Sequence, residues 1–215
     1  MTFETMLSTM AEGMLKTALI FILTLLGSLP LGMIVALLRK SKFAPIRWFI
    51  SGYISIIRGT PLMLQLLVWY FGPFYLFGWN IGGWRFPAII VAFVVNYAAY
   101  FAEIYRGGIE SIPQGQYEAA QVLGYTKTQT FMRIILPQVI KIIIPSVTNE
   151  VITLVKDTSM AFTLAYAEVF SLAKQISASQ ASFMPFLIAG VFYFVANYIV
   201  EIVMKRIEKS MDYYK

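Results

Sequence analysis

The chain has 215 residues, of which 59% are hydrophobic and 13% are charged, and this composition is typical of a membrane protein rather than a globular domain. It contains no cysteine and no histidine, which excludes disulfides, thiol catalysis and imidazole bases. The net charge of +6 does not indicate a nucleic-acid partner, because such a surface needs basic residues clustered on a solvated domain.

Five apolar runs are long enough to form membrane-spanning helices, which need about 20 residues to cross roughly 30 Å of hydrocarbon. They are residues 17–38, 61–77, 86–104, 140–155 and 185–204. An acidic flank precedes the first run, unlike the basic start of a signal peptide, so we expect this run to stay in the mature protein. The second run has an alternative start at residue 51, with a break at Arg58-Gly59-Thr60 because Pro61 suits a first helical turn.

Basic residues predict the orientation of these spans, because cytoplasmic loops carry an excess of Lys and Arg. With the N-terminus outside and the C-terminus cytoplasmic, segments 39–58, 103–141 and 205–215 lie in the cytoplasm and hold 13 of the 17 basic residues. These are Arg39, Lys40, Lys42, Arg47, Arg58, Arg106, Lys127, Arg133, Lys141, Lys205, Arg206, Lys209 and Lys215. The positive net charge is therefore explained by topology.

Small residues recur on the third span, where Ala98 and Ala102 are four positions apart. This spacing could let a second helix approach closely, although alanine is also common in membrane helices.

The longest predicted cytoplasmic loop contains EAAQVLGYTKTQTFMRIILP, residues 118–137. A turn-forming cluster starting at Pro113 precedes it, and we expect two short helices, residues 117–123 and 127–135. Gly124 between them is expected to end the first helix in a left-handed conformation. The apolar face that Ala119, Ala120 and Leu123 share predicts a surface that docks into a groove of another protein.

This loop resembles the EAA loop of permease subunits of bacterial ABC importers, with each signature position present. The matching residues are Glu118, Ala119, Ala120, Gly124, Ile134, Leu136 and Pro137. The resemblance implies that Glu118, Ala119, Ala120 and Gly124 dock onto a separate ATPase subunit and couple its closure to the membrane helices. The alternative without a partner is an amphipathic segment lying on the membrane surface.

Two further stretches, IRGTPL at residues 57–62 and NYAAYFAEIYRGGI at 96–109, resemble the permeases for polar amino acids, the group with histidine, arginine and glutamine importers. The resemblance covers residues 16–209. It implies an all-α type I ABC importer (MetI-like) permease fold with about five transmembrane helices. The whole chain, 1–215, is then one domain, with the coupling loop at about residues 107–139.

Catalysis is not expected in this chain, because it has no G-x-x-x-x-G-K-[ST] motif and no nucleophile with a histidine base. The resemblance therefore implies ATPase subunits that bind ATP and Mg²⁺, a second permease chain, identical or homologous, and an extracytoplasmic substrate-binding protein. We expect no metal site and no cofactor in this chain. The implied location is the bacterial cytoplasmic membrane.

Polar residues within the spans are the candidates for a substrate cavity, because ionisable groups at the membrane centre tend to face cavities or partners. Glu150 and its neighbour Asn149 lie near the middle of the fourth span, and a carboxylate there could hold the ammonium of an amino acid. Asp157 and Thr158 follow toward the outer mouth, and Asn96 lies in the third span. The alternatives are that Glu150 pairs with Arg58 or Arg85, that Lys156 and Asp157 form an interfacial pair, and that Asn96 only joins helices.

Arg58 is a candidate for the opposite end of the substrate, because a guanidinium could bind the carboxylate of an amino acid. Its predicted place near the cytoplasmic end of the second span favours membrane anchoring or a structural ion pair instead.

The sequence thus predicts a permease subunit of an ATP-driven importer of polar amino acids. The alternatives are an ion-coupled secondary transporter or channel subunit, which would also use intramembrane carboxylates, and a structural scaffold. The EAA loop and the small size of the chain favour the importer. The amino acid transported and the choice between homodimer and heterodimer stay open.

Overall fold

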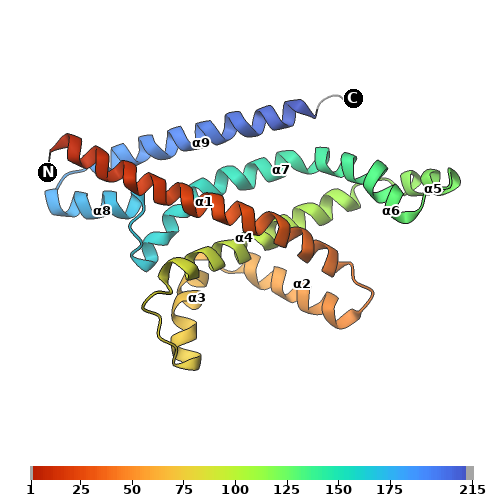
Figure 1. Cartoon of the computed structure of the whole chain (residues 1–215), viewed down its shortest axis with the longest axis horizontal. Coiled ribbons are helices and arrows are strands. Elements are labelled where there is room, and N and C mark those ends of the chain that lie inside the picture. Colours follow the sequence, from red (N-terminus) through yellow and green to blue (C-terminus); the bar gives the residue numbers. More distant parts are fainter. Residues whose placement is uncertain (1, 212–215) are drawn as a thin grey trace.

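A computed structural model describes residues 2–211, and the regular elements in that range are helices. They are α1 (Phe3–Arg39), α2 (Ala44–Gly59), α3 (Leu62–Phe77), α4 (Arg85–Glu110), α5 (Gln114–Val122), α6 (Lys127–Thr130), the π-helix η1 (Phe131–Ile135), α7 (Leu136–Asp157), the 3₁₀-helix η2 (Thr158–Leu164), α8 (Val169–Gln180) and α9 (Met184–Ser210) (Figure 1). Lys215, one of the basic residues assigned to the cytoplasm, lies outside the described residues.

Four helical segments within residues 2–211 are long and apolar enough to cross a membrane: Phe3–Arg39, Arg85–Glu110, Lys127–Leu164 and Met184–Ser210. A fifth span is formed if α2 and α3 count as one, and this pair is bent by 114° at its break. The predicted break between the two is confirmed, but α2 begins at Ala44, earlier than the sequence indicated. Pro61 directly precedes α3 and is not part of it. Its backbone is extended, with ψ of 136°, so the helical conformation is interrupted between α2 and α3 at this residue.

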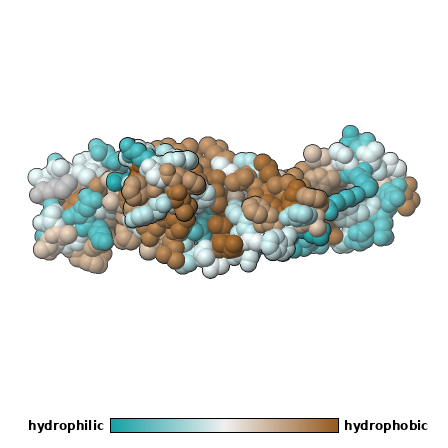
Figure 2. All heavy atoms as spheres, turned by 90° about the horizontal axis from the view of Figure 1, so that it is seen from below, coloured by the Kyte–Doolittle hydropathy of each residue, from teal (hydrophilic) through white to brown (hydrophobic). Residues whose placement is uncertain are grey.

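The long helices α1, α4, α7 and α9 run back and forth along the long axis of the molecule, whereas α3 points away from it (Figure 1). The short helices α5 and α6 lie at one end of the molecule, whereas α8 and the N-terminus lie at the other. In Figure 2, hydrophobic residues cover the middle of the visible face and hydrophilic residues gather at both ends. This distribution is expected of a bundle whose middle lies in hydrocarbon and whose ends lie in water.

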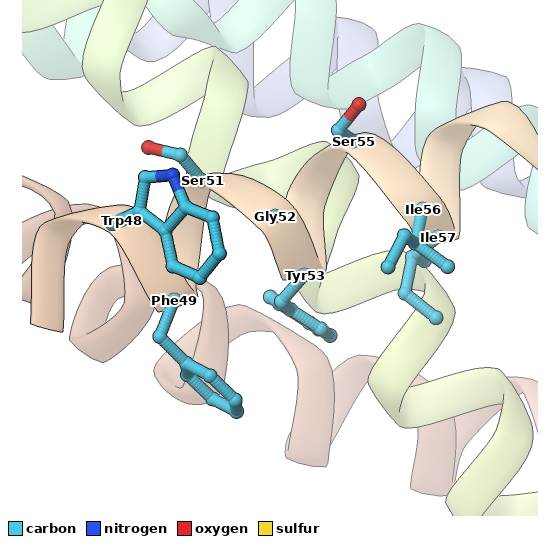
Figure 3. Close-up of a pocket in the computed structure, with 8 residues that line it drawn as sticks. All are labelled: Trp48, Phe49, Ser51, Gly52, Tyr53, Ser55, Ile56 and Ile57. Atoms are coloured by element: carbon cyan, nitrogen blue, oxygen red, sulfur yellow. The ribbon is translucent and has the colours of Figure 1, made fainter. Parts of the chain in front are cut away.

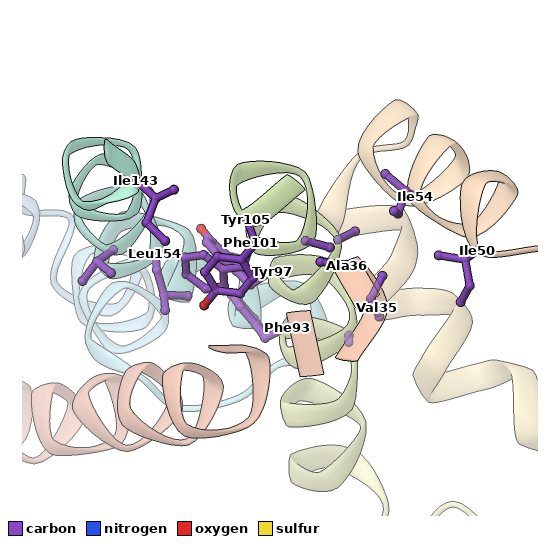
Figure 4. Packing of buried hydrophobic residues seen from close by; sticks show 14 of the residues in the cluster. Val35, Ala36, Ile50, Ile54, Phe93, Tyr97, Phe101, Tyr105, Ile143 and Leu154 are labelled. Atoms are coloured by element: carbon purple, nitrogen blue, oxygen red, sulfur yellow. The ribbon is translucent and has the colours of Figure 1, made fainter. Parts of the chain in front are cut away.

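Helix α4 is the centre of the bundle. Four aromatic side chains at four-residue intervals along it, Phe93, Tyr97, Phe101 and Tyr105, are almost completely buried. They pack among α1, α2 and α7, as Figure 4 shows. Residues four apart share one face of a helix, so this aromatic row fixes which face of α4 meets α7.

Of the two interpretations of Ala98 and Ala102, the structure supports the close approach of a second helix, since both side chains are fully buried. Gly32 of α1 lies against them, and a Cβ atom at Gly32 would be only 2.8 Å from Phe101 Cβ and 3.1 Å from the Ala98 carbonyl oxygen. The backbones of α1 and α4 are therefore in contact, which only small residues permit.

By contrast, α9 and the outer face of α2 are largely uncovered. Only 6% of the apolar window of α9 is buried, and Trp48 on α2 is 82% exposed. A cavity of about 590 Å³ lies along this outer face of α2 (Figure 3). Among residues 2–211, the only ionisable group in its lining is the Tyr53 phenol, so the cavity suits lipid chains or another apolar helix rather than a charged solute.

Candidate functional site

The break between α2 and α3 opens a smaller, polar cavity of about 330 Å³ in the bundle. Three segments line it: the break with Thr60, Pro61 and Leu62, α4 with Asn96, Tyr97 and Tyr100, and α7 with Glu150, Thr153 and Asp157. Its volume is at the lower end of the range of small-molecule sites, which is about 300–1,000 Å³. A molecule the size of an amino acid fits this range.

Helix α7 supplies two carboxylates to this cavity. Glu150, Thr153 and Asp157 are three and four residues apart, so they point from one face of the helix. The Tyr97 hydroxyl donates a 2.7 Å hydrogen bond to Asp157 Oδ2. Glu150 accepts no hydrogen bond and forms no ion pair within residues 2–211, so its carboxylate is available to a ligand.

Another wall of the cavity is the N-terminus of α3, with Pro61 and Leu62. The N–H groups of Leu64 and Gln65 already bond to the Pro61 carbonyl, at 3.1 and 3.2 Å. The first N–H groups of a helix have no partner within it and carry partial positive charge. A half-helix that starts inside a membrane can thus face an anionic group of a ligand.

Gln65 holds the break in place from its buried position on α3. Its amide Nε2 lies 2.9–3.1 Å from three acceptors, the Ile57 carbonyl, the Thr60 carbonyl and Thr60 Oγ1, which share its two hydrogens. Its Oε1 accepts a 3.0 Å hydrogen bond from Asn96 Nδ2 on α4. One amide therefore caps the end of α2, fixes Thr60 and ties both to the central helix.

Three of the predicted cavity residues, Glu150, Asp157 and Asn96, are brought together here. The other two do not line this cavity. Asn149 is exposed, because one step along the helix turns it away from the face of Glu150. Thr158 is completely buried, and its hydroxyl donates to the Val155 carbonyl at 2.6 Å.

Sequence reasoning missed the tyrosines Tyr97 and Tyr100 and the break residues Thr60 and Leu62. The available signal was the stretch beginning at Asn96, in which two tyrosines three apart follow a polar residue inside a span.

A second polar cluster lies beside the cavity, around Glu103 of α4. Arg39 of α1 and Arg106 form ion pairs with Glu103, and Arg106 also pairs with Glu110. The Arg58 guanidinium is 3.9 Å from Glu103. Neither alternative partner of Glu150 forms an ion pair with it, because Arg58 faces Glu103 and Arg85 Nη1 donates to the Ala165 carbonyl at 3.5 Å.

The EAA loop forms a helical corner at the end of the molecule. Gly124 has φ of 80°, which confirms the predicted left-handed turn, and the Tyr125 N–H closes it with a 3.0 Å hydrogen bond to the Ala120 carbonyl. The first predicted helix corresponds to α5. The second is not separate from the fourth span, because residues 127–164 form one helical segment that passes through the π-helix η1.

The face predicted for docking is divided by the fold. Ala120 is only 1% exposed and packs within this chain, so its side chain is not on the outer surface of the corner. Glu118 and Ala119 are exposed, and so are the apolar Val122 at 87% and Leu123 at 73%. The small side chain of Ala120 allows α5 to pack closely, whereas the exposed residues form the tip.

A buried carboxylate at the other end of the molecule was not predicted. Glu168 is 0% exposed and caps α8, accepting hydrogen bonds from the Phe170 and Ser171 N–H groups at 2.8 and 2.6 Å and from the Tyr193 hydroxyl at 3.0 Å. Burial raises the pKa of Glu168 above its usual range, while these hydrogen bonds act in the opposite direction. The sequence signal was an acidic residue directly before an apolar helix.

Comparison with known proteins identifies the class of this bundle. Residues 28–213 match the family described as binding-protein-dependent transport system inner membrane component, and the chain belongs to this family. It is accordingly a permease component of an ABC transport system, and nucleotide binding belongs to a separate subunit. The family assignment favours the importer over the ion-coupled alternative.

Particular relatives narrow the class to amino acid permeases. The chain is 38% identical over 208 residues to the L-cystine transport system permease protein TcyB of Bacillus subtilis (strain 168), covering 95% of this chain and 87% of the relative. It is 37% identical to the arginine transport system permease protein ArtQ of the same organism, covering 93% and 91%.

Solved structures agree with the fold. A crystal structure of an amino acid ABC transporter with histidines superposes with a TM-score of 0.87 and 33% identity, covering 98% of this chain and 99% of that one. An inward-facing MetNI methionine ABC transporter superposes with a TM-score of 0.75 at 20% identity, covering 98% and 99%. The predicted type I importer permease fold is confirmed.

Proposed function

We propose that this chain is the permease subunit of an ATP-driven importer of polar amino acids, with a preference for cationic ones. The observation that carries this proposal is the cavity at the break between α2 and α3, where two carboxylates share the lining with Leu62, the first residue of a half-helix. An amino acid is a zwitterion, and the two walls of this cavity offer opposite charge to its two ends. The relatives that transport arginine, cystine and glutamine support the same substrate class.

The charges of the lining set the preference. Glu150 and Asp157 are its carboxylic acid side chains, and none of the lysines and arginines within residues 2–211 lines the cavity. Two carboxylates attract an ammonium or guanidinium strongly where the local dielectric is low, and they repel an acidic side chain. The α-carboxylate of the substrate would lie at the N-terminus of α3, near Leu62, with Asn96 and Thr60 as further polar contacts.

Coupling to ATP is assigned to the corner formed by α5 and α6. Its tip exposes Val122 and Leu123 beside Glu118 and Ala119 at the hydrophilic end of the molecule, which suits contact with a soluble subunit. One helical segment, residues 127–164, joins this corner to Glu150 and Asp157, so a push on the corner would move the cavity wall. ATP and Mg²⁺ belong to the ATPase that docks there.

The remaining partners follow from the family and the uncovered surfaces. An extracytoplasmic binding protein delivers the substrate, and a second permease chain, identical or homologous, completes the pathway. The chain lies in the bacterial cytoplasmic membrane with its N-terminus outside and its C-terminus and coupling corner in the cytoplasm. The excess of basic residues in segments 39–58, 103–141 and 205–215 supports this orientation.

Equilibrium binding to the purified ATPase–permease complex in lipid nanodiscs tests this function. We expect L-arginine to bind more tightly than L-glutamine, and L-glutamate not to bind. Glu150→Gln should weaken L-arginine binding about tenfold or more, the effect of losing one charge-assisted contact.

Glu201→Gln is the matched control. Glu201 is a glutamate of α9 that pairs with Lys205 at 2.5 Å and does not line the cavity, so binding should not change. Preferred binding of L-glutamate, or unchanged L-arginine binding in Glu150→Gln, would contradict the proposal.

A further inference from the structure

A second cavity, of about 530 Å³, adjoins the amino acid cavity on the side of Arg58. Arg39, Ser51, Ser55, Arg58, Tyr100 and Glu103 contribute to its lining. Tyr100 lines both cavities, and Gly59 of the second precedes Thr60 of the first, so the two share the wall at the helix break.

The charge of the second cavity has the opposite sign. Three guanidinium groups, those of Arg39, Arg58 and Arg106, gather around the carboxylates of Glu103 and Glu110, which leaves one positive charge in excess. Both Glu103 oxygens are already engaged, Oε2 by Arg39 and Oε1 by Arg106. Arg58 is the guanidinium of the three that makes no hydrogen bond to either carboxylate.

Arg58 is held in position without using its donors. It lies 5.5 Å from the centre of the Tyr100 ring and 3.9 Å from Glu103, and it makes no hydrogen bond within residues 2–211. Its side chain is 42% exposed. A guanidinium stacked on an aromatic ring keeps N–H groups free for a planar anion such as a carboxylate.

The hydroxyl groups of α2 complete the lining. Ser51 and Ser55 are four residues apart, and in Figure 3 both side chains point to the same side of α2, away from Phe49. Arg58 follows three residues later on the same helical face. An anion beside Arg58 would thus have two hydroxyl donors within the same cavity.

We propose that the Arg58 cavity is a second station on the pathway, which takes the carboxylate of the amino acid as it leaves the cavity of Glu150 and Asp157. This inference rests on the proposed function and deepens it. Passage requires several sites that each bind weakly enough to release. The cavity of Glu150 and Asp157 attracts the cationic end of the substrate, and the Arg58 cavity attracts its anionic end. The substrate can therefore move past Tyr100 from one cavity to the other without losing all its charge contacts at once.

Dissociation rates from the purified ATPase–permease complex in nanodiscs test the second station. The probes are L-arginine and L-argininamide, which has nearly the same shape and keeps both cationic groups but lacks the carboxylate. Arg58→Gln should slow the dissociation of L-arginine about tenfold, and that of L-argininamide less than about twofold, because only the former has a carboxylate for Arg58. Arg58→Lys should lie between, since an ammonium keeps the charge without the fork.

Arg47→Gln is the matched control, because Arg47 is an exposed arginine of the same helix that does not line the cavity. If Arg58→Gln slows the dissociation of both probes equally, Arg58 has a structural role. If it slows neither, Arg58 has no role in dissociation. Each result overturns the second station. A free or lipid phosphate is the other source of an anion. If the effect of Arg58→Gln appears only in phosphatidylglycerol nanodiscs and not in phosphatidylcholine ones, the site binds lipid headgroups and the proposal fails.

The two proposals fail separately. If the wild-type complex binds no L-arginine, the proposed function is wrong and the second station with it. If it binds L-arginine but Arg58→Gln leaves the dissociation rate unchanged, only the second station is wrong.

Discussion

The Tyr97 hydroxyl donates a 2.7 Å hydrogen bond to Asp157 Oδ2, which ties the centre of α4 to the C-terminal end of α7. Both residues line the amino acid cavity. Tyr97 is 2% exposed, so its position is fixed by the core, and it holds the carboxylate in turn. The cavity therefore has one restrained carboxylate, Asp157, and one without a partner within residues 2–211, Glu150.

Removing this hydroxyl should destabilise the bundle. Tyr97→Phe keeps the ring but leaves Asp157 without its donor, and a hydrogen bond to a charged group contributes about 1.5–3 kcal/mol. We expect a lower thermal unfolding midpoint of the nanodisc-embedded complex, measured by intrinsic fluorescence. Tyr198→Phe, which alters a tyrosine 57% exposed on α9, is the control. Equal midpoints for the two variants would contradict this role of Tyr97.

Gln65 should act as a positioning residue for the substrate site. Gln65→Leu keeps the approximate size but removes the donor to Ile57 and Thr60 and the acceptor for Asn96. Without these hydrogen bonds, the N-terminus of α3 is no longer held in a fixed position in the cavity of Glu150 and Asp157.

We expect Gln65→Leu to weaken L-arginine binding about tenfold, as the loss of one such contact would, with partial recovery in Gln65→Asn. Gln180→Leu, at an exposed glutamine of α8, should bind normally. If Gln65→Leu lowers stability but leaves the dissociation constant unchanged, the amide has only a structural role.

A bulky substitution in the coupling corner should cause a selective loss of the bound ATPase. Ala119 is exposed on α5, so Ala119→Trp should leave the permease folded while its bulk prevents docking. We expect the ATPase to copurify with the wild type and to be lost from this variant. Ala178→Trp makes the same change at an exposed alanine of α8, at the opposite end of the molecule, and should retain the ATPase. Retention of the ATPase by both variants would place the docking surface elsewhere.

The buried carboxyl of Glu168 should make the stability of the folded chain depend on pH. Because burial raises its pKa in the folded chain, the unfolded chain loses this proton first as pH increases. The stabilising contribution is thus present below the ordinary glutamate pKa and is lost as pH rises through the raised value. Glu168→Gln has no charge and keeps one oxygen, which can accept from the Phe170 or the Ser171 N–H, so the pH-dependent loss should disappear.

The measurement is the unfolding midpoint between roughly pH 4 and pH 8. We expect the midpoint of Glu168→Gln to fall less over this range than that of the wild type. Glu12→Gln, at an exposed glutamate of α1, should follow the wild type. A Glu168→Gln variant with the wild-type slope would contradict the assignment.

The features that depend on local physics could be predicted from the order of the residues alone. Hydrophobic length placed the spans, because crossing hydrocarbon requires about 20 apolar residues whatever their neighbours. Pro61 marked the break between α2 and α3, and Gly124 marked the corner of the coupling loop, because each restricts or permits particular backbone angles. These properties belong to short stretches and need no knowledge of the packing.

Which polar side chains meet could not be predicted in this way, because it depends on how the helices pack together. Asn96, Glu150 and Asp157 share a cavity while Asn149 and Thr158 do not line it, because the rotation of α7 against α4 is set by contacts between helices far apart in sequence. The same packing turned Ala120 inward, gave Gln65 its place at the break and put Arg58 beside Glu103 rather than Glu150. The sequence gives the residues on every face of a helix, but the neighbouring helices determine which face is buried.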